Sequence, residues 1–175
     1  MPIVSEQRRG RDGALTTEPQ GHILVVDDEG DIRNLMGRVL QGLGYKVLLA
    51  ADGEEALFYL VLGQPIRLIL CNLRMPYMSG PALYGHVAKC CPALSERFVF
   101  CSGDVVSDDS QRFLLESGRP TLAKPFELHE LEGTVRRYDR CQALQLDSRA
   151  TRQLLALAYQ GWGACWPAAR LRVAG

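Results

Sequence analysis

Residues 22–28 read His-Ile-Leu-Val-Val-Asp-Asp, and this stretch decides the fold class. Its four consecutive apolar residues form a β-prone run without polar alternation, which is typical of a strand covered on both faces. The two acids that follow would then lie at the carboxyl end of that strand. Because ligands of open α/β sheets bind beyond the carboxyl ends of the strands, a functional site is expected at this edge.

Four further apolar runs follow, and a helical pattern separates each run from the next. The predicted strands cover residues 22–27, 45–51, 66–71, 97–101 and 121–123. Between the first two, apolar residues at positions 32, 35, 36, 39, 40 and 43 have the spacing of one helical face. The alternation predicts an α/β fold, a five-stranded parallel doubly wound sheet with flanking helices.

The two ends of the chain differ in composition from this central part. Residues 1–21 lack apolar periodicity, so we expect a disordered leader there, followed by one folded domain over residues 22–140. Residues 141–175 are interpreted as a partly helical appendage, because leucines at 154, 155 and 157 indicate a short helix. We expect this C-terminal helix or tail to dock on a partner or to form a homodimer.

Composition excludes several classes of function. The formal net charge of the 175 residues is zero, which gives no reason to expect binding to nucleic acid or to a membrane surface. The sequence has neither a long apolar span nor the apolar core of a secretory signal, so a cytoplasmic protein is expected. The six cysteines show no C-x-x-C spacing, which argues against a zinc or redox motif.

Five polar residues fall at the predicted carboxyl ends of four strands. A metal-dependent phosphoryl site needs acids that hold a divalent cation, a carboxylate that attacks phosphorus and an ammonium group that receives the added charge. An amide stands where this layout predicts the attacking acid, so the sequence indicates a phosphoryl site without its nucleophile. The five residues are Asp27, Asp28, Asn72, Ser102 and Lys124.

Four segments, in this order and at this spacing, resemble the receiver domain of two-component response regulators (CheY-like) across residues 22–140. They are Val-Val-Asp-Asp-Glu at 25–29, Leu-Arg-Met-Pro at 73–76 with Met-Ser-Gly at 78–80, Phe-Cys-Ser-Gly-Asp at 100–104, and Ala-Lys-Pro-Phe at 123–126. The resemblance implies a flavodoxin-like receiver fold and a non-enzymatic role in phosphorelay signal transduction. It also implies a histidine kinase or phosphotransfer protein as partner, contacted around the first helix.

The resemblance further implies a magnesium site. Asp28 would bind Mg²⁺ directly, Asp27 would act through water, and the backbone carbonyl of Arg74 would complete the protein's share of the coordination. Because residue 72 carries no negative charge, Mg²⁺ binding is expected to be weak or absent.

The phosphoryl contacts implied by the resemblance are Lys124 and Ser102, and the Lys124–Pro125 peptide bond would be cis. Asn72 falls on the phosphoacceptor position, where a neutral amide cannot form an acyl phosphate. Lys124 thereby loses its nearest partner and is left to Asp27 or Asp28. Thr121 stands where many receivers carry an aromatic switch residue, so signalling through such a residue is not expected.

These observations favour an atypical receiver, or pseudo-receiver, that acts by phosphorylation-independent partner binding. Two alternatives remain open at this point. One is a conventional Mg²⁺-dependent phosphorylated receiver in which Asn72 is a natural or engineered variant of the acceptor aspartate. The other is a flavodoxin-like small-molecule binder, although Asp-Asp-Glu after the first strand would repel a phosphate unless a cation intervened.

Overall fold

The computed structural model describes residues 21–103, 107–139 and 144–162. Five strands form one sheet in the order β2-β1-β3-β4-β5, and every neighbouring pair is parallel. This confirms the predicted fold class. The strands are β1 His22–Val26, β2 Lys46–Ala50, β3 Ile66–Asn72, β4 Phe98–Ser102 and β5 Thr121–Ala123.

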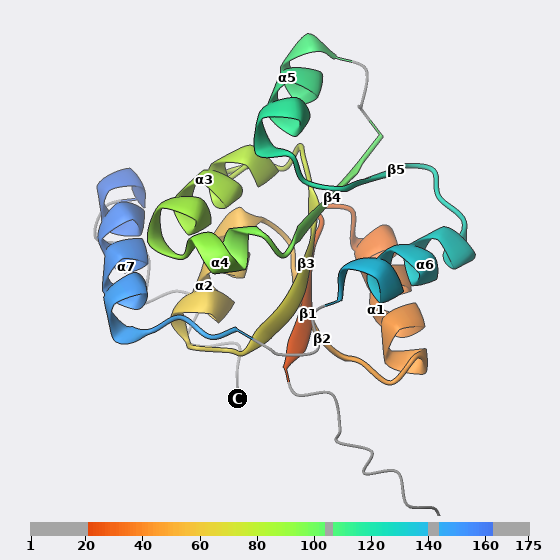
Figure 1. Ribbon diagram of the computed structural model, residues 1–175, viewed down its shortest axis with the longest axis horizontal. Helices are drawn as coiled ribbons and strands as arrows, with labels where there is room; N and C mark the ends of the chain where they lie inside the picture. The colour runs from red at the N-terminus through yellow and green to blue at the C-terminus, as the bar shows by residue number, and fades with distance from the viewer. Residues whose placement is uncertain (1–20, 104–106, 140–143, 163–175) are drawn as a thin grey trace, which may run out of the picture.

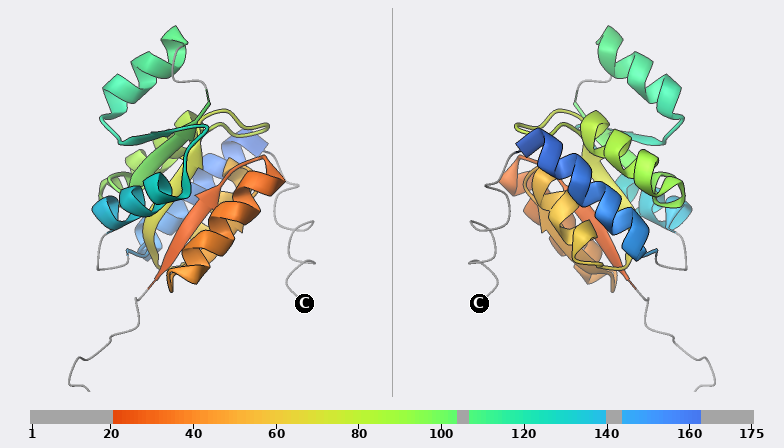
Figure 2. Two further views of the ribbon diagram at one scale, coloured as in Figure 1. Left: turned by 90° about the vertical axis from the view of Figure 1, so that its right-hand side faces the viewer. Right: turned by 90° about the vertical axis from the view of Figure 1, so that its left-hand side faces the viewer.

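Helices cover both faces of the sheet (Figures 1 and 2). On one face, buried side chains of α1 and α6 pack with Ile23 and Val25. On the other, α2, α3 and α7 pack with Leu24 and Val26. The four strands β1 to β4 therefore contribute alternate side chains to two separate cores, as expected for strands buried on both faces. The helices are α1 Gly30–Gly42, α2 Gly53–Val61, α3 Gly80–Cys90, α4 Pro92–Ser95, α5 Asp108–Ser117, α6 Leu128–Tyr138 and α7 Ser148–Trp162.

The short helix α4 was not predicted from the sequence, and α5 takes an unusual position. In both Figures 1 and 2, α5 projects away from the other helices, beyond the edge of the sheet. Phe113 anchors α5, with its ring centroid 5.0 Å from that of Phe100 and 5.8 Å from that of Tyr84. Leu115, two residues after Phe113 and on the opposite side of α5, is 82% exposed. Phe113 and Leu114 thus pack α5 against the core on this face of the sheet.

Helix α7 belongs to the core of the domain. Leu146, Ala150 and Leu154 are buried in the same cluster as the inward side chains of α2 and α3. Asp147 caps the helix by accepting hydrogen bonds from the backbone N–H groups of Arg149 and Ala150. The apolar face of α7 therefore packs against α2 and α3 of the same chain. Residues 1–20 of the predicted leader (1–21), residue 140, and residues 141–143 and 163–175 of the predicted appendage (141–175) lie outside the described residues.

A buried ion pair joins β3 to the end of α6. Arg67 Nε and Nη2 donate to the two carboxylate oxygens of Asp139, over 2.9 and 2.5 Å, and the guanidinium lies 5.5 Å from the centroid of the Tyr45 ring. This bidentate geometry fixes the end of α6 against the sheet. In the described ranges, no helix is long and apolar enough to cross a membrane.

Candidate functional site

The carboxyl ends of β1, β3, β4 and β5 bring the predicted site residues to one edge of the sheet. A cleft of about 510 Å³ opens there. Asp27 lies beneath it, only 1% exposed, at the end of β1. The structure therefore brings all the predicted side chains together, as the strand-end argument requires. The cleft is lined by Asp28, Glu29, Ile32, Asn72, Arg74, Ser102, Gly103, Lys124 and Pro125.

The carboxamide of Asn72 is the centre of this arrangement. Its Nδ2 atom donates to Asp28 Oδ1 over 2.8 Å and to the backbone carbonyl oxygen of Arg74 over 3.0 Å. Both partners can only accept, so the amide nitrogen, and not the amide oxygen, must face them. One amide group therefore uses both of its donor hydrogens on the two oxygens that the family resemblance assigned to Mg²⁺.

In this arrangement the amide of Asn72 contacts two of the candidate ligands of a magnesium ion. Mg²⁺ takes oxygen ligands in near-octahedral geometry, usually one or two carboxylates with several waters, and here the N–H₂ group of Asn72 points at two of the candidate oxygens. In the described part of the chain, no three His, Cys, Asp or Glu side chains are grouped so that they could hold a metal ion. The two amide hydrogens of Asn72, which carry partial positive charge, contact the same oxygens that a cation would contact.

Lys124 is paired within the chain. Its Nζ lies 2.7 Å from Asp27 Oδ2 and 3.2 Å from Glu29 Oε1, and its side chain is 10% exposed. Burial alone would lower the pKa of Lys124, but the hydrogen bonds and charges of Asp27 and Glu29 outweigh burial and raise that pKa above its usual 10.5. The ammonium group is therefore held charged and neutralised by carboxylates of β1 and the loop after it.

The sequence argument placed one of these partners correctly and missed the other. Asp27 was one of the two expected partners of Lys124, and the structure selects it over Asp28. Glu29 was named only within the Val-Val-Asp-Asp-Glu motif, although its position directly after two acids indicated a third carboxylate that could pair with Lys124. Its backbone N–H also donates to Asp27 Oδ1 over 3.0 Å, so Glu29 braces the carboxylate that it helps to neutralise.

Ser102, Thr121 and the Lys124–Pro125 bond stand where the sequence placed them. Ser102 is buried at the end of β4, and its carbonyl oxygen accepts a hydrogen bond from the backbone N–H of Lys124 over 2.8 Å. The Lys124–Pro125 peptide bond is cis. Thr121 is exposed at the start of β5. The roles of Ser102 and Lys124 in phosphoryl binding stay predictions.

Neither neighbouring thiol is placed to act as a nucleophile in the cleft. Cys71 and Cys101 are fully buried and pack into the cores on opposite faces of the sheet. Burial, with a smaller contribution from Asp27, raises the pKa of Cys101 to about 12 and holds the pKa of Cys71 well above its usual value. Both side chains are therefore protonated thiols that face away from the cleft.

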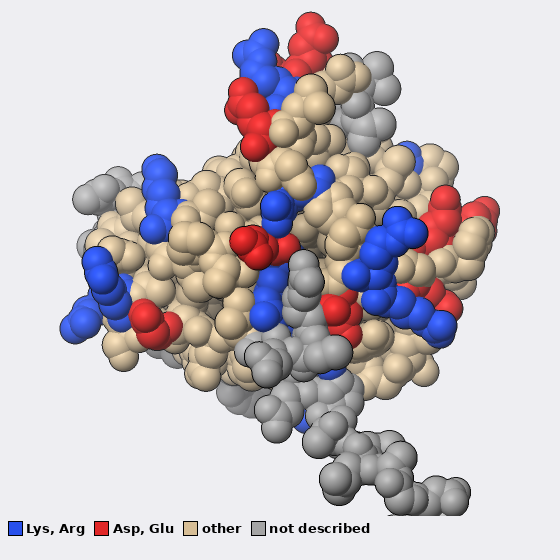
Figure 3. Space-filling model, in the orientation of Figure 1, with Lys and Arg blue, Asp and Glu red and all other residues tan. Residues whose placement is uncertain are grey.

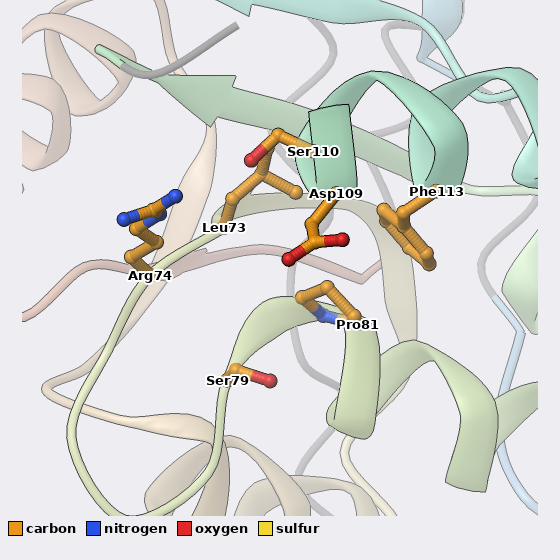
Figure 4. Close-up of a pocket in the computed structure, with 7 residues that line it drawn as sticks. All are labelled: Leu73, Arg74, Ser79, Pro81, Asp109, Ser110 and Phe113. Atoms are coloured by element: carbon orange, nitrogen blue, oxygen red, sulfur yellow. The ribbon is translucent and has the colours of Figure 1, made fainter. Parts of the chain in front are cut away.

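A second groove lies beside the cleft, between α3 and α5 (Figure 4). It has a volume of about 400 Å³, and Arg74 is the only predicted site residue among its lining residues. The guanidinium of Arg74 donates to Ser107 Oγ over 3.1 Å, at the N-cap of α5. The residue whose carbonyl accepts from Asn72 therefore also contacts the start of α5.

Charges on the visible face of the molecule are mixed. Figure 3 shows basic and acidic side chains interspersed, without a broad surface of one sign. The lining of the cleft contains two carboxylates (Asp28 and Glu29) and two cationic side chains (Lys124 and Arg74). The face seen in Figure 3 therefore has no basic patch of the kind that binds nucleic acid.

Comparisons with known proteins agree with this geometry. The family model for the response regulator receiver domain matches residues 23–136. The sensor kinase CckA of Brucella abortus is 34% identical over 148 residues, which is 78% of this chain and 15% of that protein. The solved structure of the chemotaxis protein CheY4 of Vibrio cholerae is 28% identical with a TM-score of 0.61, covering 68% of this chain and 98% of that one.

A third similar structure was solved with a phosphoryl mimic. It is the response regulator TrrA of Thermotoga maritima in complex with Mg²⁺-BeF, 30% identical with a TM-score of 0.57, covering 67% of this chain and 98% of that chain. The chain spans less than half of the length of the first curated relatives that it matches. The match therefore concerns the domain around the cleft, and α7 lies beyond the residues that the family model covers.

Proposed function

Since this chain belongs to the response regulator receiver domains of two-component signalling, we propose that it works by binding its signalling partners and not by carrying a phosphoryl group. The observation that carries the proposal is the carboxamide of Asn72 at the phosphoacceptor position. A carboxylate attacks phosphorus as an anion with free oxygens, whereas an amide oxygen would have to form a cationic or imidate adduct. On this proposal the chain catalyses no reaction and forms no acyl phosphate.

We also propose that Mg²⁺ binding is weak or absent. The amide of Asn72 donates to Asp28 and to the Arg74 carbonyl, so a metal ion would have to break both hydrogen bonds before it met those oxygens. Those hydrogen bonds satisfy the buried amide of Asn72, whose donors would be costly to leave unpaired. Charge balance supports the same conclusion, because Lys124 already neutralises Asp27 and Glu29. The cleft therefore needs no cation to be electrostatically stable.

The proposed partner is a cytoplasmic histidine kinase or phosphotransfer protein, bound over α1. Leu35 of α1 is 49% exposed, and Leu128 at the start of the adjacent α6 is half-exposed. Apolar side chains at the centre of an interface with a charged rim are typical of protein-binding surfaces. We assign no homodimer to α7, because its buried leucine and alanine side chains pack within the chain.

The two alternatives are less well supported. A conventional phosphorylated receiver requires a nucleophile that Asn72, Cys71 and Cys101 cannot supply. A small-molecule binder requires a concave apolar pocket with few polar groups, whereas the lining of this cleft is rich in charged and polar side chains. Partner binding, unlike phosphotransfer, does not require a carboxylate at position 72.

The proposal predicts binding that is independent of both metal and phosphoryl donor. Histidine kinases and phosphotransfer proteins of the organism that encodes the chain would be purified and titrated one at a time. We expect at least one to bind with the same Kd, within about twofold, in Mg²⁺ with acetyl phosphate and in EDTA. Leu35→Asp should weaken that binding by about tenfold or more, since it buries a charge in the interface.

The matched control is Leu62→Asp, which changes an equally exposed leucine at the end of α2 on the opposite face. It should leave the Kd unchanged. Binding that appears only with Mg²⁺ and acetyl phosphate would refute phosphorylation independence, and equal effects of the two leucine variants would refute the proposed surface.

A further inference from the structure

Helix α7 packs into the core of this chain, yet a receiver domain is complete without it. In the right-hand view of Figure 2, α7 lies in front of the sheet, between α2 and α3. The family model ends at residue 136, before α7 begins at Ser148. The CheY4 structure is matched over 98% of its length by 68% of this chain. Helix α7 is therefore an addition that covers α2 and α3 of a domain whose relatives fold without it.

The side of α7 that faces these helices has a simple apolar pattern. Ala150 and Leu154 lie four residues apart on one side of α7, and Leu146 precedes them by the same interval. All three are buried in one cluster with the α2–α3 surface, which includes Leu60 of α2 and Val87 of α3. The α2–α3 surface thus binds an amphipathic helix, which is a recurring mode of peptide recognition.

The contacts that hold α7 on this surface are unevenly distributed. The residues before α7 are fixed, because Leu144 and Ile66 exchange two backbone hydrogen bonds, both of 2.7 Å. Within residues 148–157, the part of α7 whose side chains are described, no hydrogen bond or ion pair reaches α2 or α3. Leu155 and Leu157 are only half-buried. The described part of α7 is therefore attached firmly at its start and by apolar packing alone beyond it.

The packing of α7 against α3 is also incomplete. A crevice of about 290 Å³ lies between the two helices, lined by Lys89, Cys90, Gln153, Ala156 and Leu157. A closely packed contact would leave no such space, and side chains along a crevice lose the dispersion contacts that they would otherwise make. Helix α7 is therefore held less tightly than a fully packed helix.

We propose that the α2–α3 surface is a second docking surface, which binds an amphipathic helix of a partner protein, and that α7 occupies it as an intramolecular competitor. A partner then binds only those molecules from which α7 has left, so α7 lowers the apparent affinity by the fraction of open molecules. This inference goes beyond the proposed function, because α1, over which the kinase or phosphotransfer protein is placed, packs on the other face of the sheet.

The crevice indicates what the partner helix carries. Ala156 lines the crevice, and the space beside its methyl group is unfilled. A leucine at the matching position of a partner helix would fill that space and gain contacts that α7 lacks. A second copy of this chain would bring the same alanine, at a lower effective concentration than the attached α7. The expected occupant is therefore a helix of another protein, with the pattern of α7 and a larger apolar side chain at this position.

The probe for this surface is a fluorescein-labelled synthetic peptide of residues 144–162 that carries Ala156→Leu, titrated into the full chain and followed by anisotropy. The chain variant Gln153→Pro breaks α7 at an exposed position without altering the α2–α3 surface. Its Kd for the peptide should be at least about tenfold lower than that of Gln153→Ala, the matched control in which α7 stays helical. A peptide that also carries Leu154→Asp should bind neither variant.

Equal Kd values for the two Gln153 variants, or no binding of the peptide to Gln153→Pro, would overturn the inference. Loss of cooperative urea unfolding in Gln153→Pro would do the same, because α7 would then be required for the fold. If wild type is a dimer that Gln153→Pro converts into a monomer, the occupant is a second copy of this chain and the inference is wrong. A kinase that binds wild type should bind both Gln153 variants with one Kd, so each of the two proposals can fail while the other stands.

Discussion

Asn72→Asp is expected to be labelled by acetyl phosphate in the presence of Mg²⁺, whereas the unmodified chain is expected to take up no phosphoryl group. The substitution supplies the missing nucleophile beside Asp28, the Arg74 carbonyl and Lys124, which already converge on the cleft. Loss of a nucleophile alone can cost about 10⁶ in rate, so a gain of at least about 10³ in labelling rate is expected here. Intact-protein mass spectrometry after incubation with acetyl phosphate measures it.

The same variant should depend on Mg²⁺ for stability. The introduced carboxylate removes the two hydrogen bonds of the amide and places a like charge next to Asp28, which costs about 1–3 kcal/mol without a cation. Added Mg²⁺ should recover this loss in urea unfolding. Asn72→Ala is the control, because it removes the same hydrogen bonds without adding charge and should respond to neither Mg²⁺ nor acetyl phosphate. Wild type labelled as fast as Asn72→Asp would contradict the account.

Lys124→Met is expected to lower the free energy of unfolding by about 3–5 kcal/mol. The substitution leaves the buried carboxylate of Asp27 without its cationic partner, and removing one member of a buried ion pair costs far more than the pair contributes. Urea unfolding at neutral pH measures the loss. Lys89→Met, on the exposed surface of α3, is the matched control and should change stability by less than about 0.5 kcal/mol.

The effect of Lys124 has a defined pH dependence. Because the folded state raises the pKa of Lys124 above 10.5, the stability it contributes is fully present below that pH and is lost as pH rises through the folded pKa. The difference in stability between wild type and Lys124→Met should therefore be constant up to about pH 9 and should shrink at higher pH. A double variant, Asp27→Asn with Lys124→Met, should recover part of the loss. A Lys124→Met protein as stable as wild type would show that the pair is not structural.

The sheet could be predicted from the sequence because each strand is a run of apolar residues bounded by polar ones. Residues 121–123 matched β5 at both ends, and the remaining strand limits differed by one residue at most. The edge at which Asp27, Asn72 and Lys124 meet followed from topology alone, since parallel strands share their carboxyl ends. The cap at Asp52 was also readable, because its Oδ1 accepts from the Glu55 N–H over 2.8 Å.

Other features depend on tertiary contacts that a local pattern does not contain. Arg67 falls inside the apolar run of β3, and only the distant Asp139 explains how its charge is buried. Leucines of the tail indicated a helix, but the surface that buries Leu154 is formed by α2 and α3. The φ of 62° at Tyr77, in the loop between β3 and α3, could not be predicted, because tyrosine gives no signal for positive φ. In the site, the direction of the Asn72 amide required the positions of both of its acceptors.

The measurement that tests the central claim most directly is a chemical-shift titration of the unmodified protein with Mg²⁺ and then with beryllofluoride. The account predicts that the backbone amide signals of Ser102 and Lys124 stay in place at concentrations that saturate Asn72→Asp, because the carboxamide already occupies the oxygens that a metal would need. Saturable shifts of those two signals in wild type, of the size seen in the variant, would contradict it.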